Sequence, residues 1–260
     1  MSTKMSEEDW AHTLAVFRAC LPRRGRKAGD DRRFLEALHV FTVENVRWRA
    51  LPEGFGPWNS VWKRFDRLSK AGVFEAFFDT LASDEFVRAS HPDVRLDDRA
   101  RAWVCGRSKG GQEGQALGRS RGGFTTKIHA KSDASGDIIA FDLTGGEASD
   151  ARHFDLLLDI GPDIQPRAVI CDKGYASKAN GEAARDRGIV PVIPHKANER
   201  DKPAFFAKTL YKARSRIEQG VERLNRFKRV ALRCEKTARN FTSIVSFAAG
   251  LCLITFVHMA

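Results

Sequence analysis

The sequence lacks the cysteine pattern and the phosphate-binding motif that mark several common protein classes. Its five cysteines are scattered and include no C-x-x-C pair. This argues against a disulfide scaffold or a zinc site and fits a reducing cytosol. The first ten residues, MSTKMSEEDW, are polar and acidic, so no signal peptide is expected. The Gly-rich stretch from 106 to 123 has no G-K-[ST] at Walker spacing, which argues against a nucleotide cradle.

Long apolar runs are scarce as well. The segment from 241 to 260 has the length to span a bilayer, but Thr242, Ser243, Ser246, Gly250 and Thr255 dilute its apolar character. We therefore expect a buried terminal helix in a cytoplasmic protein, with a membrane span as the alternative.

Acidic residues are outnumbered, since 33 Asp and Glu stand against 44 Lys and Arg, which gives a net charge of +11. The segment 99–131 has 8 basic residues and 1 acidic residue, and the segment 199–239 has 13 and 5. Two basic segments on a mildly acidic body predict a polyanionic partner, most simply nucleic acid. A generic basic surface kept soluble by its charge is the alternative.

The first 90 residues read as a small all-α domain. Ser6 followed by Glu7 and Glu8 predicts the start of a helix that runs to Cys20. Further helices are expected at Asp30–Val46, from Pro57 or Asn59 with Trp62, Phe65 and Leu68 as core residues, and after Gly72. Interleaved Arg and Trp residues fit a DNA reader of the helix-turn-helix type, and a purely structural bundle is equally compatible.

Residues 91–260 alternate between strand and helix patterns. The expected elements are a short strand in DVRLDD, strands at Phe124–Asp133 and Asp137–Gly146, a helix at Ala151–Ile160, a buried strand from Ala168 that ends at Asp172, a helix at Ser177–Arg187, a strand at Ile189–Ile193 and a helix at Tyr211–Lys228. This order predicts an α/β fold with a ribonuclease-H-like mixed sheet and flanking helices.

The helix at Tyr211–Lys228 carries Glu218 beside an apolar stripe, while Asp172 ends a buried strand. Carboxylates that converge from a strand and a helix can hold Mg²⁺ for phosphodiester chemistry. Taken alone, Glu218 could instead belong to a solvated i,i+4 pair with Arg214, and Asp172 could be a helix cap. The metal-site interpretation therefore requires that the oxygens of Asp172 and Glu218 meet in space.

Several blocks carry a family resemblance. QALGRSRGGFTTKIHA, LTGGEASDAR, ICDKGYAS, the spacing Tyr211-x-x-Arg214-x-x-x-Glu218 and RCEKTARNF occur in this order, and VRWRALPEGFGPWNSVWKRF precedes them. The chain resembles the DDE transposases of bacterial insertion sequences, specifically the insertion-sequence-five family. The resemblance implies a DNA recombination enzyme that cuts the ends of its element and joins them to target DNA.

By this resemblance Asp172 is the second catalytic acid and Glu218 the third. The first acid is assigned to Asp97, with Asp98 as the alternative, by allowing a one-residue deletion in the family spacing, which otherwise puts Leu96 at this position. The chain also departs from the family pattern at Arg99 and Trp103, which replace a small residue and a histidine. All three acids would be metal ligands. The residues expected to contact DNA are Tyr211, Arg214, Lys173, Arg119, Arg121, Lys127 and Arg226.

The resemblance also implies the cofactor and the partners. Two Mg²⁺ or Mn²⁺ ions are expected as cofactors. Double-stranded DNA with terminal inverted repeats, target DNA and a second copy of the chain are expected as partners, at the nucleoid and away from membranes. The altered spacing around Asp97 leaves an inactive DNA-binding remnant open, and a stand-alone nuclease of the same fold is a further alternative.

Overall fold

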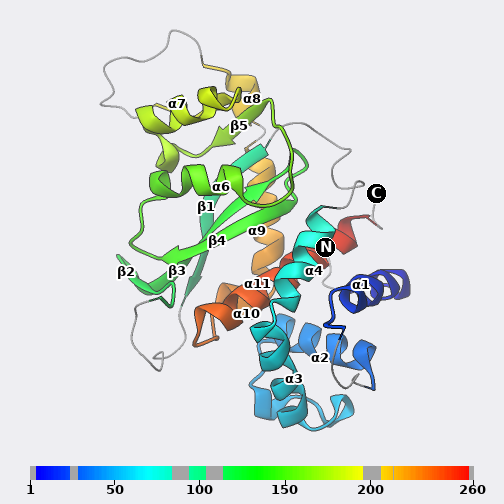
Figure 1. Cartoon of the computed structure of the whole chain (residues 1–260). Helices are drawn as coiled ribbons and strands as arrows, with labels where there is room; N and C mark the ends of the chain where they lie inside the picture. The colour runs from blue at the N-terminus through cyan, green and yellow to red at the C-terminus, as the bar shows by residue number, and fades with distance from the viewer. Residues whose placement is uncertain are drawn as a thin grey trace. The chain divides into compact units, whose positions relative to one another are not determined.

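The computed structural model describes residues 4–23, 29–83, 94–103, 114–195, 206–212 and 214–257, with the backbone alone for 94–103 and 255–257. The chain divides by packing into two compact units (Figure 1). The first unit contains residues 1–81, 102–115 and 223–260, and the second contains 82–101 and 116–222. The expected division into domains 1–90 and 91–260 stays a prediction, while by packing the C-terminal segment groups with the N-terminal helices.

The N-terminal helices of the first unit begin and end close to the expected residues. They are α1 (Glu7–Ala19), α2 (Asp31–Glu44), α3 (Trp58–Lys70) and α4 (Val73–Ala82). Ser6 caps α1, since its hydroxyl accepts from the Asp9 N–H while the Asp9 carboxylate accepts from the Ser6 N–H. Asp30 caps α2, and Asn45 ends that helix at a positive φ of 54°. Local capping chemistry thus sets these boundaries.

Aromatic side chains form the core of the first unit. Phe65 and Phe74 are fully buried with ring centroids 5.4 Å apart, and Phe41 stacks on Trp48 at 3.7 Å. Trp62, which the sequence placed in this core, is 36% exposed. That assignment is wrong because the buried face of α3 consists of residues 61, 65, 68 and 69, and Trp62 lies beside this face.

The C-terminal helix α11 (Ala238–Val257) packs among the N-terminal helices. Its residues from Ser243 to Leu251 are nearly all buried, and Phe247 meets the rings of Phe74 and Phe77. The expected buried terminal helix is therefore confirmed. Over the described parts of the chain, no helix has the length and hydrophobicity needed to cross a membrane.

The second unit is built on a mixed sheet. Its strands are β1 (Val94–Trp103), β2 (Gly118–Ser120), β3 (Gly123–Ser132), β4 (Ile138–Gly145), β5 (Ala168–Cys171) and β6 (Val190–Val192). The order is β2-β3-β1-β5-β6, with β4 antiparallel to β3 and with β5 parallel to both β1 and β6. This is the ribonuclease-H-like arrangement that the sequence predicted. The expected Gly-rich loop contains β2, and its residues 106–113 lie outside the described residues.

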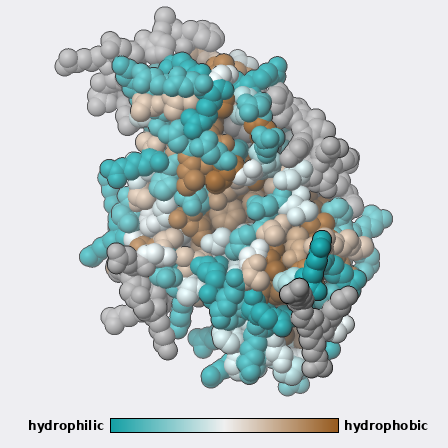
Figure 2. All heavy atoms as spheres, in the orientation of Figure 1, coloured by the Kyte–Doolittle hydropathy of each residue, from teal (hydrophilic) through white to brown (hydrophobic). Residues whose placement is uncertain are grey.

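Helical segments flank this sheet. They are the 3-10 turns η3 (Asp150–His153) and η4 (Lys173–Tyr175) and the helices α6 (Phe154–Asp159), α7 (Lys178–Asp186), α8 (Lys208–Lys212) and α9 (Ser215–Asn225). Helix α6 contacts β3 and β4, and α7 contacts β6. Figure 2 shows hydrophobic side chains at the surface in the region of α6, where Leu156 is 43% exposed.

The single helix expected at Tyr211–Lys228 is wrong. The structure has α8, a turn at Arg214, α9, and then the separate helix α10 (Lys228–Ala231). The apolar stripe Ile217, Val221 and Leu224 is nevertheless buried as expected, at 5% exposure or less. Because periodicity alone sets no boundary, it could not show where the helix breaks.

Candidate active site

Asp172 occupies the carboxyl end of the central strand β5. All four residues of β5 are buried, and the strand pairs on both sides, with β1 and with β6. The next residue, Asp172, is partly exposed, with 23% of its side chain accessible. Its Oδ1 accepts the N–H of Lys173 at 2.7 Å and so caps η4. Asp172 is therefore a cap, as one interpretation held, and also a carboxylate at the end of a buried strand.

Arg214 joins Asp172 to Glu218. Arg214 lies just before α9, and Glu218 lies in the first turn of that helix. The Nη1 atom of Arg214 is 2.9 Å from Glu218 Oε1 and 3.9 Å from Asp172 Oδ1. The two carboxylate oxygens are thus no further apart than the sum of these distances. The structure brings Asp172 and Glu218 together, as the metal-site interpretation requires.

Asp97 is placed by the register of the sheet. Leu96 on β1 pairs with Cys171 on the parallel strand β5. Asp97 and Asp172 are the residues that follow this pair, so their backbones occupy corresponding positions on neighbouring strands. Asp98 comes one position later on β1. The side chains of both residues lie outside the described part of the structure.

The described residues fit a divalent cation. Among side chains that the structure describes, no group of three His, Cys, Asp or Glu residues is placed to hold a metal ion. Asp172 and Glu218 nevertheless converge on one cationic group, the guanidinium of Arg214. Converging carboxylate oxygens are the donors that Mg²⁺ and Mn²⁺ accept. The two carboxylates therefore suit these ions. Asp97, expected as the third ligand, stays a prediction.

A buried polar network holds the turn that follows Asp172. Tyr175, fully buried, has its hydroxyl 3.4 Å from His129 Nδ1, and His129 Nε2 is 2.8 Å from Thr144 Oγ1. The Tyr175 carbonyl accepts a hydrogen bond of 2.8 Å from the Asn180 side chain. These contacts attach η4 to β3, β4 and α7. The backbone that carries Asp172 is therefore fixed by groups from three neighbouring elements.

The histidine of this network is uncharged at neutral pH. Burial lowers the pKa of His129 to about 4, and the nearby charges of His153 and Lys127 act in the same direction. The rings of His129 and His153 stack with centroids 4.5 Å apart, and His153 Nδ1 lies 3.2 Å from Asp142 Oδ2. A neutral imidazole can donate one hydrogen bond, to Tyr175 or to Thr144, while its other nitrogen accepts a hydrogen bond from the second hydroxyl.

Lys127, for which a DNA contact was expected, belongs to the interior. Its side chain is 7% exposed, and its ammonium pairs with Asp150 and donates to the Ala148 carbonyl at 2.7 Å. Lys131 is buried too, and burial lowers the pKa of its ammonium to about 8. The side chain is buried because β3 is covered on both faces. The expected DNA contact of Lys127 stays a prediction.

The other residues expected to contact DNA are more accessible. Lys173, Arg119 and Arg121 are exposed. Tyr211 on α8 is half-buried, and the guanidinium of Arg214 lies 5.5 Å from the centre of its ring. Arg226 is half-buried, follows α9 and belongs to the first unit.

Sequence reasoning missed His129, His153, Tyr175 and Asp150 as supports of the site. A Cβ placed on Gly174 would lie 2.7 Å from Asp150 Oδ2, so this glycine allows the close approach of η3 to η4. Gly174 does not adopt a positive φ, so its role here is this close approach. The available signal was a histidine and a lysine inside a strand pattern, which suggests buried, partnered polar groups.

Comparison with known proteins identifies the family. A family model described as "Transposase DDE domain" matches residues 89–253, and one described as "Putative transposase of IS4/5 family" matches residues 5–78. The chain is 33% identical over 174 residues to "Putative transposase for insertion sequence element IS402" of Burkholderia cepacia, covering 64% of this chain and 79% of that protein. It is 31% identical over 139 residues to "Putative transposase for insertion sequence element IS6501" of Brucella ovis, covering 49% and 97%.

A solved structure, "Crystal structure of a pre-cleavage Mos1 transpososome", aligns over 91% of this chain and 82% of that chain at 12% identity, with a TM-score of 0.29. A TM-score this low does not establish a shared fold. The fold assignment therefore rests on the strand order and on the match to the family model. The DDE family model covers more than half of the chain, and the chain therefore belongs to the DDE transposases of insertion sequences, which move DNA with the help of divalent metal ions.

Proposed function

We propose that this chain cleaves DNA at the ends of its element and joins the freed ends to target DNA, with Asp97, Asp172 and Glu218 as the catalytic acids. The observation that carries the proposal is the convergence of Asp172 and Glu218 on Arg214 Nη1, at 3.9 and 2.9 Å. The two acids come from a strand end and a helix that lie far apart in the sequence. The strand register, which pairs Leu96 with Cys171, supports Asp97 over Asp98 as the first acid.

The three acids would hold two Mg²⁺ or Mn²⁺ ions. When bound, such ions promote deprotonation of the attacking oxygen and stabilise the charge on the leaving oxygen. Until then, Arg214 balances the negative charge of Asp172 and Glu218. Both carboxylates are partly exposed, at 23% and 33%, so ions and DNA can reach them.

The chemistry consists of two phosphodiester exchanges. In the first, a hydrolysis, water attacks the phosphorus at the element end and forms a new P–O bond, the P–O3′ bond breaks, the water loses a proton to solvent, and the leaving O3′ takes up a proton from solvent. In the second, the freed 3′-hydroxyl attacks a target phosphodiester, forms a new P–O bond and releases a target 3′-hydroxyl. Arg214 and Tyr211, with the exposed Lys173, Arg119 and Arg121, would position the phosphates.

The partners in this proposal are duplex DNA with terminal inverted repeats, target DNA and a second copy of the chain that allows two ends to be synapsed. The reaction takes place on the chromosome, which puts the protein at the nucleoid. In this proposal the domain of residues 1–90 binds DNA, and the domain of residues 91–260 carries out catalysis. Arg226 would extend the phosphate contacts of the second basic segment.

A DNA-binding remnant that no longer cuts is the second candidate. The sequence after Asp97 departs from the family pattern, because Arg99 and Trp103 replace a small residue and a histidine. This departure favours the remnant. The two candidates differ in catalysis but not in DNA binding, so one assay separates them.

The test uses labelled duplexes with the inverted repeats that flank the gene, Mg²⁺ and a target plasmid. Joined product supports the transposase, nicking without joining indicates a nuclease, and a salt-sensitive complex without cleavage indicates the remnant.

Variants then test the assigned acids. Glu218→Gln should lower cleavage roughly a thousandfold, since the loss of several kcal/mol of charge stabilisation corresponds to this factor. Its binding of DNA should persist. Glu222→Gln, the same change one turn later at an exposed position of α9, is the matched control and should cut normally. Retained cutting by Glu218→Gln would refute the assignment.

A further inference from the structure

The first unit contains two helices joined by a short turn, α3 and α4, with Ala71 and Gly72 between them. In a helix-turn-helix reader the second helix of such a pair ordinarily enters the major groove. Applied to this chain, that rule would select α4. The packing and the charges of the two helices can be compared directly, since both lie in one packing unit.

Helix α4 is covered by α11. Phe77 and Phe74 are fully buried and meet Phe247 of α11, with ring centroids 6.3 and 6.1 Å apart. The contact is close, because a Cβ on Gly250 would lie 2.6 Å from Phe77 Cε1. Glu75 accepts a hydrogen bond of 3.0 Å from Ser243. Most of the surface of α4 is therefore covered by α11, a helix from the other end of the chain.

The remaining surface of α4 is unsuited to DNA. Its exposed residues are Ala76, Asp79 and Thr80. The helix has no Lys or Arg, and its charged residues are Glu75 and Asp79. A negatively charged helix would be repelled by the phosphate groups that line the groove.

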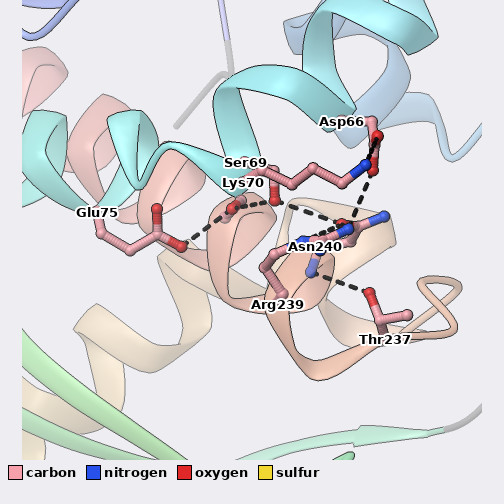
Figure 3. Close-up of polar contacts among 8 residues, drawn as sticks. Asp66, Ser69, Lys70, Glu75, Thr237, Arg239 and Asn240 are labelled. Carbon is pink, nitrogen blue, oxygen red and sulfur yellow. Dashed lines mark hydrogen bonds and ion pairs between the residues drawn. The ribbon is translucent and has the colours of Figure 1, made fainter. Parts of the chain in front are cut away.

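The inner side of α3 is attached to α11 by polar contacts (Figure 3). The Ser69 and Ser243 hydroxyl oxygens are 2.8 Å apart, and Arg239 donates to Asp66 at 3.0 Å. Lys70, at the end of α3, pairs with Asp66 at 2.7 Å. The contacts of Ser69 and Asp66 with α11 fix the rotation of α3 about its axis, which determines the residues that it presents to solvent, whereas the Lys70–Asp66 pair lies within α3.

The outer side of α3 is basic and polar. Asn59, Ser60, Lys63, Arg67 and Lys70 are exposed. At 3.6 residues per turn they lie within an arc of roughly 100°. Among the described residues, the side chains of Lys63 and Arg67 make no hydrogen bond or ion pair. Trp62, which is 36% exposed, lies outside this arc.

We infer that this outer side of α3, which we call the α3 face (Asn59, Ser60, Lys63, Arg67 and Lys70), is the surface that enters the major groove of duplex DNA at the element ends. The inference rests on the proposed function for the identity of the DNA. The first turns present Asn59, Ser60 and Lys63 to base edges, as in helices that read DNA from their N-terminal residues. Arg67 and Lys70, further along, contact phosphates.

The experiment measures binding by fluorescence anisotropy of a labelled terminal-repeat duplex and of a scrambled duplex, in EDTA so that no cleavage occurs. Asn59→Ala should reduce the preference for the terminal repeat by roughly tenfold. Arg67→Ala should weaken both complexes and lower the slope of log affinity against log salt by about one. Thermal unfolding should be unchanged in both variants, because the replaced side chains are exposed.

Two controls make the outcome decisive. Thr80→Ala changes the exposed side of α4, and Arg18→Ala removes an exposed arginine of the same unit, outside both basic segments, that pairs with Asp31 at 3.0 Å. Both should bind within twofold of the unaltered chain. The inference is overturned if Thr80→Ala loses the sequence preference, or if the variants of the α3 face bind normally.

Failure of the inference can be told apart from failure of the proposed function. In a Glu218→Gln background, which should not cut, binding should still depend on Asn59 and Arg67. If the unaltered chain joins DNA but ignores substitutions on α3, the inference fails while the proposed function stands. If no cleavage is seen but binding depends on α3, the catalytic proposal fails alone.

Discussion

Acid should weaken the second unit through His129, which is fully buried between Tyr175, Thr144 and His153. The pKa of an unfolded histidine is 6.5, and burial lowers that of His129 to about 4. Above pH 6.5 the ring is neutral in both states and has no effect on stability. Below that pH the unfolded chain binds a proton that the folded chain does not, so stability falls until His129 itself titrates.

The magnitude follows from the size of the shift. Each pH unit between the two pKa values removes about 1.4 kcal/mol from the free energy of unfolding. The full loss is about 3 kcal/mol once the pH is below the pKa of about 4. The charged groups that face the His129 ring are His153, Asp150 and Lys127. Of these, Asp150 alone raises the pKa of His129.

Urea unfolding of the chain and of His129→Gln, at a series of pH values between 6.5 and 4, measures this contribution. Glutamine can keep hydrogen bonds to Thr144 and Tyr175 but does not titrate. The difference between the two curves isolates His129, because groups such as Glu75, whose pKa burial raises, contribute equally to both. Parallel pH dependences in the two proteins, or a His129 imidazole that titrates by NMR near pH 6.5, would refute the reasoning.

Three further substitutions test the packing. Lys127→Met should cost about 3 kcal/mol of stability, since it leaves the Asp150 carboxylate without its buried partner; urea unfolding measures this. Its affinity for DNA should match that of the unaltered chain, whereas weaker binding with normal stability would restore Lys127 as a DNA contact. Gly250→Val should cost about 1–3 kcal/mol because its side chain overlaps Phe77. Gly181→Ala, on α7 with its nearest contact at 3.4 Å, should stabilise by roughly 0.5–1 kcal/mol. Equal thermal shifts for the two glycine variants would contradict the close contact of α4 with α11.

Signals that act over a few residues were readable from the sequence. Ser6 and Asp30 cap their helices through bonds to N–H groups three residues later, so the boundaries of α1 and α2 could be predicted. The hairpin of β3 and β4 follows from two strand patterns and a turn. Asp172 could be placed at a strand end because a continuous apolar run precedes it.

Contacts between distant segments could not be read in this way. The break at Arg214 puts Tyr211 and Glu218 on separate helices, and periodicity gives no sign of it. Lys127 was expected to contact DNA, and only the tertiary structure shows that β3 is covered on both faces and that the Lys127 ammonium pairs with Asp150. Burial depends on what packs against a residue, which the flanking sequence does not state.

The sequence by itself determined most of the element order, the candidate acids Asp172 and Glu218, and the excess of basic charge. Tertiary structure alone decided that these acids share Arg214 and that α11 packs on α4, leaving the α3 face toward solvent. The physical reason is that hydrogen-bonded caps and apolar runs are local properties of the chain. Convergence and coverage arise when segments up to about two hundred residues apart exclude water from one another.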